Sequence, residues 1–116
     1  MRVLVCGGRK YADRDRVRET LNRLSVERGG ITLIIHGGAP GADELADKWS
    51  KAAYVERIVF VAEWHVHGRR AGPLRNQRMV DEGKPDLCVA FPGGIGTADM
   101  VRRARKAGIE VVEIPG

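Results

Sequence analysis

A chain of 116 residues is long enough for one domain that buries roughly two thirds of its unfolded surface. Its apolar runs fall well short of the roughly 20 residues that a membrane-spanning helix needs, so we expect no membrane association. The formal net charge of +5 favours an anionic partner. We therefore predict a single domain over residues 1–116 with an anionic ligand.

The first predicted strand, residues 3–6, starts too early for the apolar region of a signal peptide to precede it. Cys6 and Cys88 each lie within an apolar segment and lack the spacing of metal ligands. Buried free thiols are typical of proteins in a reducing compartment. We expect a cytoplasmic protein.

Apolar segments alternate with helical patterns along the whole chain. The predicted strands, short and rich in Val and Ile, are residues 3–6, 32–36, 58–62, 86–91 and 110–114. The predicted helices begin after an N-cap at Asp13 or Asp15 and end at residues 29–30, and then cover residues 42–53, 73–83 and 96–107. Residues 63–72 are predicted as a long loop. This rhythm predicts an α/β domain with a parallel sheet and helices on both faces.

Glycine turns or polar pairs follow four of the predicted strands. They are Gly7-Gly8-Arg9, Gly37-Gly38, Glu63-Trp64 and Pro92-Gly93-Gly94, in chain order. Right-handed crossovers place the carboxyl ends of parallel strands along one edge of the sheet. With the strand order 3-2-1-4-5, the first and fourth strands are neighbours whose helices leave to opposite faces. We expect the ligand in the crevice between their two glycine turns.

The segment Pro92-Gly93-Gly94-Ile95-Gly96-Thr97 joins the end of a strand to the start of a helix. Glycines without a Cβ let backbone N–H groups approach an anion closely. The first amides of the following helix are unpaired and lie at the positive end of its dipole. Thr97 adds a hydroxyl donor. The segment therefore predicts a phosphate-binding site.

Two common nucleotide-binding fingerprints are missing. Gly7 and Gly8 do not form GxGxxG, and His36 rather than an acid ends the second predicted strand. A GxxxxGK[ST] sequence is also missing, so neither a nicotinamide oxidoreductase nor a P-loop nucleoside triphosphatase is predicted. His65 and His67 lack a third metal ligand at suitable spacing. We predict no metal and no cofactor.

The chain resembles a known superfamily almost end to end. Residues 92–97 are similar to the PGGxGT turn of the Lonely Guy (LOG) phosphoribohydrolases, and residues 75–79 resemble the arginine-bearing helix start that precedes it. Residues 37–43 and 71–76 resemble the small, single-domain YspA-like branch. These motifs together resemble the SLOG superfamily, named after the SMF/DprA DNA-processing proteins and the LOG enzymes.

This resemblance implies a Rossmann-like fold that binds nucleotides or nucleotide-derived ligands. LOG members hydrolyse the N-glycosidic bond between a base and ribose 5′-monophosphate. Relatives commonly dimerise beside the site, which implies a homodimer or a higher homo-oligomer.

One position departs from the LOG pattern. LOG enzymes continue as GTxxE, whose glutamate is catalytic, and the matching residue here is Met100. A thioether neither stabilises an oxocarbenium ion nor activates a water. Asp99 and Glu63 are the nearest carboxylates in the predicted arrangement, although neither matches the family position. The catalytic residue stays open, with Asp99, Glu63 and Arg75 as candidates.

Arg75 is the predicted phosphate clamp, because a guanidinium fork suits a phosphate and the family places an arginine here. Asn76 either orients a ribose hydroxyl or caps a backbone group. Asp43 either contacts ribose or only favours the dipole of its helix. Trp64 either stacks on a base or packs. Arg9 either closes over a second phosphate or is solvated.

We predict a binder of a nucleotide or phosphoribosyl small molecule, acting as a sensor or sequestering module. The predicted ligand-binding residues are Gly7, Gly8, Arg9, Gly37, Gly38, Asp43, Trp64, Arg75, Asn76, Pro92, Gly93, Gly94, Gly96 and Thr97. The alternative is a LOG-like hydrolase of nucleoside 5′-monophosphates or of a nucleotide-derived signal. A third, less favoured interpretation is single-stranded DNA binding through basic residues around Arg69, which few aromatic residues accompany.

Overall fold

Five parallel strands form one sheet in the computed structural model, which describes all of residues 1–116. They are β1 (Arg2–Cys6), β2 (Leu33–His36), β3 (Glu56–Val59), β4 (Leu87–Ala90) and β5 (Glu110–Glu113). The strand order is β3-β2-β1-β4-β5, which confirms the predicted order and makes β1 the central strand. The predicted α/β fold with a parallel sheet is confirmed.

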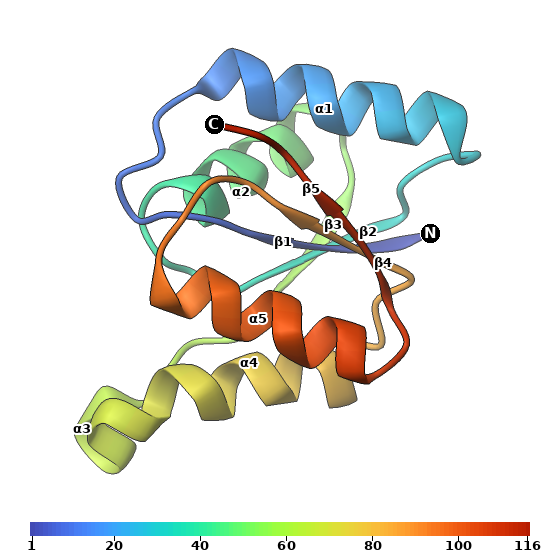
Figure 1. The fold of residues 1–116 in the computed structure, drawn as a ribbon. Coiled ribbons are helices and arrows are strands. Elements are labelled where there is room, and N and C mark those ends of the chain that lie inside the picture. The colour runs from blue at the N-terminus through green and yellow to red at the C-terminus, as the bar shows by residue number, and fades with distance from the viewer.

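Helices cover both faces of the sheet (Figure 1). The helices α1 (Arg14–Glu27) and α2 (Ala42–Ala52) lie on one face, and α4 (Ala71–Asp81) and α5 (Ile95–Lys106) lie on the other. The carboxylate of Asp13 caps α1 by accepting a hydrogen bond from the amide of Arg16 at 3.0 Å. None of these helices is both long and apolar enough to cross a membrane.

The prediction of a loop over residues 63–72 is wrong. This stretch forms the short helix α3 (Trp64–His67), a 3-10 turn (Gly68–Arg70) and the start of α4. Helix α4 begins at Ala71 rather than at Pro73. Proline is tolerated there because the amides of a first helical turn have no intrahelical acceptor.

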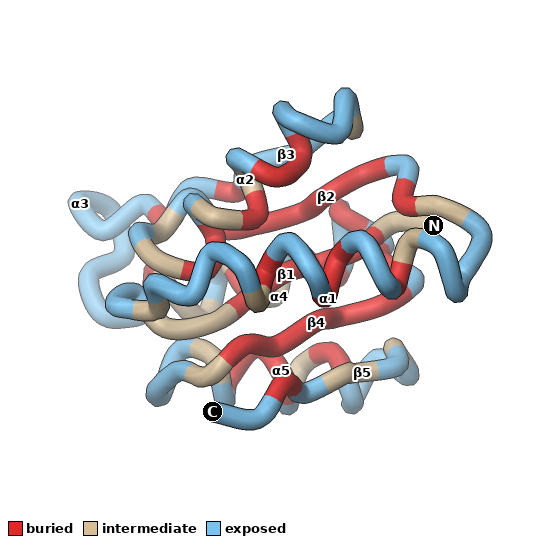
Figure 2. Tube along the Cα trace, turned by 90° about the horizontal axis from the view of Figure 1, so that it is seen from above, coloured by how far each residue is buried: buried red, intermediate tan, exposed pale blue.

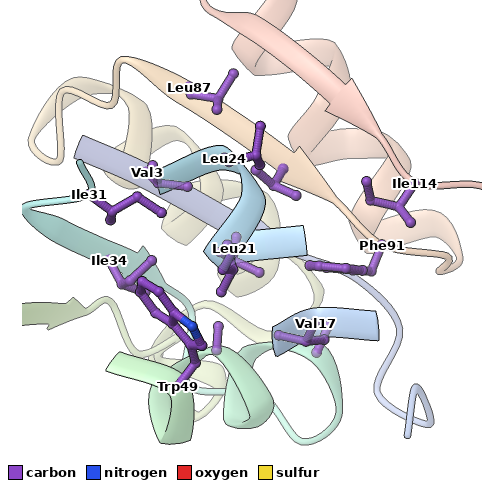
Figure 3. Close-up of a cluster of buried hydrophobic side chains, with 14 residues drawn as sticks. Val3, Val17, Leu21, Leu24, Ile31, Ile34, Trp49, Leu87, Phe91 and Ile114 are labelled. Atoms are coloured by element: carbon purple, nitrogen blue, oxygen red, sulfur yellow. The ribbon is translucent and has the colours of Figure 1, made fainter. Parts of the chain in front are cut away.

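The three inner strands β2, β1 and β4 are buried on both faces of the sheet, and each face has its own core. Along β1, Val3 and Val5 join the cluster under α1 and α2, whereas Leu4 and Cys6 join the cluster under α4 and α5. Figure 2 shows the buried path of the three inner strands, and Figure 3 shows the first cluster, where Trp49 packs beside Ile34. Burial of both faces explains why these strands are apolar without alternation.

Cys6 on β1 and Cys88 on β4 are neighbours in the second cluster. Both are free and buried, and their Sγ atoms lie 4.0 Å apart. The predicted burial of both thiols is therefore confirmed.

The edge strand β3 differs from its prediction. It runs over residues 56–59 rather than 58–62, because its pairing with β2 ends where Val59 lies opposite His36. All four of its residues are exposed. Phe60 and Ala62 continue the chain as buried residues outside the strand, although the amide of Phe60 still donates to the carbonyl oxygen of His36 at 2.9 Å.

Candidate functional site

The glycine turns after β1 and β4 meet at the carboxyl edge of the sheet, as the strand order predicts. The amide of Gly8 donates a hydrogen bond to the carbonyl oxygen of Pro92 at 2.8 Å. A Cβ on Gly8 would lie 2.9 Å from that oxygen, and a Cβ on Gly93 would lie 2.8 Å from the Gly8 nitrogen. Side chains therefore do not fit at either position without movement of the backbone.

The loop between β2 and α2 packs against the first of these turns, the one after β1. Gly41 has a φ of +83°, and a Cβ there would collide with the backbone of Gly8 and Arg9. The amide of Ala42 donates to the carbonyl oxygen of Gly8 at 3.2 Å. Loops from three adjacent strands thus come together at one edge.

The amino end of α5 opens from this edge toward solvent. Gly94 is the N-cap and provides no side-chain hydrogen bond to the helix. The first hydrogen bond of α5 runs from Ala98 to Gly94, which leaves the amides of residues 95–97 without acceptors in the chain. Gly94 and Gly96 are exposed and have no atoms within 4 Å of an added Cβ. An anion has room to reach these amides.

Arg75 reaches across the ends of β2 and β3 from the first turns of α4. Its Nη1 donates to the carbonyl oxygens of Gly37 at 2.7 Å and Phe60 at 3.4 Å, and its Nε donates to the side-chain oxygen of Asn76 at 3.0 Å. Its Nη2 has no acceptor within the chain. The guanidinium is therefore held at the carboxyl edge with one nitrogen free.

Partial burial of Arg75 lowers the pKa of its guanidinium, and the charge of Asp43 opposes that shift. The charge of Arg9 lowers the pKa of Arg75 further. Arginine remains protonated at neutral pH under such shifts. Two nearby cations favour an anion at this edge.

Asp43 is buried at the start of α2, where it holds the preceding loop. Its Oδ2 accepts hydrogen bonds from the amides of Gly37 at 3.0 Å and Ala39 at 3.3 Å. Burial raises the pKa of this carboxyl, although both hydrogen bonds and nearby positive charges oppose the shift. The structure places Asp43 as the residue that shapes the β2–α2 loop.

Asn76 and Asp99 are buried between α4 and α5. The Nδ2 of Asn76 donates to the carbonyl oxygen of Gly96 at 3.3 Å and to Asp99 Oδ2 at 3.0 Å. Asp99 also accepts from Arg102 at 2.7 Å and Arg103 at 2.8 Å. Burial raises the pKa of Asp99, but the hydrogen bonds from Arg103 and Asn76 and the charges of both arginines outweigh it and lower that pKa.

The two arginines around Asp99 were not among the predicted site residues. Their spacing from Asp99, three and four residues along one helix, is a signal that the sequence offered. Met100 is buried in the core cluster under α4 and α5, with 1 % exposure. The residue that the resemblance matches to the LOG glutamate therefore lies in the core of this protein.

A small depression of about 50 Å³ lies beside Arg75, at the junction of the chain after β3 with α4. It is lined by Val61, Glu63, His67, Ala71, Leu74, Arg75 and Arg78. Glu63 is exposed, and its side chain makes no hydrogen bond within the chain. Trp64 is half exposed and lies over Gly72, where an added Cβ would approach its ring to 3.3 Å. The structure thus places Glu63 and Arg75 in one depression, with Trp64 adjacent in sequence.

The parallel sheet with glycine loops at its carboxyl edge defines a Rossmann-like α/β protein. Residues 1–67 match the family model described as the YspA, cpYpsA-related SLOG family. The chain is 41% identical to the Gene 61 protein of Mycobacterium phage D29, over 96% of this chain and 94% of that protein. This chain therefore belongs to the YspA, cpYpsA-related SLOG family.

Two solved structures share the fold. DNA processing protein A (DprA) from Streptococcus pneumoniae superposes with a TM-score of 0.77 at 18% identity and covers 99% of this chain. The structural genomics target TM1055 superposes with a TM-score of 0.67 at 22% identity, over 96% of this chain and 72% of that chain. The present chain spans 50% of the DprA chain.

Proposed function

We propose that this protein binds a nucleotide or another ribose phosphate at the carboxyl edge of the sheet, as a sensor or sequestering module. The observation that carries the proposal is the convergence of two glycine turns beside the open amino end of α5 and the free nitrogen of Arg75. Backbone amides at a helix start and an arginine are the donors that phosphate oxygens accept best. Membership of a SLOG family supports the same ligand class.

In this proposal each part of the ligand has its own contacts. Phosphate oxygens accept hydrogen bonds from the amides of residues 95–97, from the Thr97 hydroxyl and from Arg75 Nη2. The sugar lies against the backbone of Gly8 and Gly38, and the base lies toward Trp64.

Isothermal titration calorimetry with AMP, ribose 5-phosphate and adenosine tests the proposal. We expect heat from the two phosphates and none from adenosine. Arg75→Ala should weaken phosphate binding by about tenfold or more, because a charge-assisted hydrogen bond is lost. The control Arg105→Ala removes only an exposed ion pair with Glu113 and should leave the affinity unchanged within about twofold. No heat from any member of a wider nucleotide panel contradicts the proposal.

A second candidate function is hydrolysis of a nucleotide at the N-glycosidic bond. It is supported by the exposed carboxylate of Glu63 in the same depression as Arg75, since Asp99 is already bound by two arginines and an amide. Incubation with nucleoside 5′-monophosphates followed by chromatography distinguishes the two functions. Release of free base that is lost in Glu63→Gln supports the hydrolase, and unchanged nucleotides support the binder.

Two further partners are proposals of lower rank. The exposed cations Arg9, Lys10, Arg69 and Arg70 at this edge support single-stranded nucleic acid, whose affinity would fall steeply with salt concentration. The exposed edge strand β3, with Ile58 and Val59 facing solvent, supports a homo-oligomer. Fluorescence titration of a labelled oligonucleotide at two salt concentrations tests the first, and light scattering of the purified protein tests the second.

A further inference from the structure

We infer that Asn76 is a positioning residue of the proposed phosphate site. Its amide joins the guanidinium of Arg75 to the first turn of α5, so that both sets of phosphate donors keep one relative geometry. The inference rests on the proposed function and adds to it the residue that holds the site together.

The hydrogen bonds of Asn76 support this role. The side chain is 4% exposed. Its oxygen accepts from Arg75 Nε at 3.0 Å, and its nitrogen donates to the carbonyl oxygen of Gly96 at 3.3 Å and to Asp99 Oδ2 at 3.0 Å. Both amide hydrogens are used within the chain, which leaves none for a ligand. Asn76 therefore acts on a ligand through Arg75 and through α5.

Asp99 determines which way the Asn76 amide points. An ionised carboxylate only accepts hydrogen bonds, so the nitrogen of Asn76 must face Asp99 and the oxygen must face Arg75. Arg102 and Arg103 hold that carboxylate at 2.7 and 2.8 Å, and Arg103 also donates to Gln77 Oε1 at 2.9 Å. The resulting connection runs from Arg103 through Asp99 and Asn76 to Arg75 and ties α4 to α5.

The connection matters because arginine is a long and flexible side chain. Ordering it at the moment of binding costs conformational entropy, which lowers affinity. Nη1 is held by two carbonyl oxygens, but Asn76 is the side chain that holds Nε. Without it, the plane of the guanidinium is set by the Nη1 contacts alone, and Nη2 is aimed less well at the anion.

A double-mutant cycle with ribose 5-phosphate as the probe measures this effect. We expect Asn76→Ala to weaken binding about tenfold in the natural protein. In the Arg75→Lys background, which lacks the Nε–H group, the same change should weaken binding by a clearly smaller factor, because only the contribution of Asn76 through α5 remains. Equal weakening in both backgrounds, or no weakening in either, overturns the inference. If Asn76→Ala does not fold, Asn76→Ser takes its place in both backgrounds.

A second measurement needs no ligand and separates this inference from the proposed function. Solvent exchange of the Arg75 Nε–H proton, followed by NMR and assigned by its absence in Arg75→Lys, should be slow in the natural protein and at least about tenfold faster in Asn76→Ala. The control is Gln77→Ala, at the residue next to Asn76. It removes the hydrogen bond from Arg103 to the Gln77 side chain and should leave the exchange rate of the Arg75 Nε–H proton unchanged. Unchanged exchange in Asn76→Ala overturns the inference, whether or not ribose 5-phosphate binds. Absence of binding by the natural protein contradicts the proposed function alone.

Discussion

The arginines of this protein differ in the groups to which their guanidinium nitrogens donate. Arg75 binds two backbone carbonyl oxygens and an amide oxygen, and keeps one nitrogen free at the carboxyl edge. Arg103 is bound to Asp99 and Gln77, and so fixes one helix against another. Arg105 pairs with Glu113 in solvent. A substitution at each of these positions therefore tests a different property: ligand binding, helix packing or surface charge.

Loss of the Asp99 carboxylate should destabilise the protein more at neutral pH than in acid. The folded-state pKa of Asp99 is lowered, so its contribution is present above the unfolded pKa of about 3.9 and is lost as the pH falls through the folded pKa. We expect Asp99→Asn to reduce the free energy of unfolding by about 1–3 kcal/mol at pH 7 and by less below pH 4. Urea unfolding across that range measures the difference.

Glu113→Gln is the matched control, because it also removes one carboxylate that accepts from an arginine. That pair is more than half exposed on both sides, so the change should be about 0–1 kcal/mol. If the loss of unfolding free energy in Asp99→Asn is the same at every pH, the role assigned to the ionised carboxylate is contradicted.

At the scale of elements, the turn between β4 and α5 depends on one glycine more than on its neighbour. A Cβ on Gly93 would collide with the Thr97 side chain and crowd the Gly8 nitrogen, whereas a Cβ on Gly94 would meet nothing within 4 Å. We expect Gly93→Ala to lower stability by about 1–3 kcal/mol and Gly94→Ala by much less. Thermal unfolding of the two variants side by side measures this, and equal melting temperatures contradict it.

The sequence was sufficient to predict the elements whose signals are local. Asp13 was one of two predicted caps of α1, and β1, β2 and β4 were apolar runs that end on glycine turns, so their ends were accurate to a residue or two. The β3 boundaries were wrong because Phe60 and Ala62 are apolar yet lie beyond the pairing with β2. An apolar residue in the sequence indicates burial, whereas a strand is defined by backbone pairing with a neighbouring strand.

The site was predictable as far as topology could place it. Parallel strands in the predicted order put the turns at Gly8 and Gly93 side by side, and the structure joins them by a hydrogen bond. Strand order does not predict the direction in which a side chain points. That Asn76 faces α5, and that Asp99 is bound by two arginines, follows from how α4 packs on α5, which no local pattern specifies.

For the whole molecule, β1 connects the two cores. Its residues point alternately into the cluster under α1 and α2 and into the cluster under α4 and α5, with exposures of 0% from Val3 to Val5. The sheet edges are open by comparison, since all of β3 is exposed. Stability should therefore be concentrated along the central strand.

Leu4→Ala should lower the free energy of unfolding by about 2–5 kcal/mol, because it opens a cavity between the sheet and its covering helices. Ile58→Ala on β3 removes a side chain that is 39% exposed and should lower it by less than about 1 kcal/mol. Urea denaturation of both variants compares them. Similar losses would show that the edge strand is covered in solution.

The pair of thiols between β1 and β4 provides a natural reporter. Cys6 immediately precedes the turn at Gly7, and its hydrogen bond with Cys88, together with burial, raises the pKa of its thiol. Thiolate, the reactive species, is therefore scarce until these neighbouring strands separate. The rate at which a small alkylating reagent modifies these two thiols therefore reports how often the strands separate. A molecule that bridges both turns will protect the sulfurs without touching them.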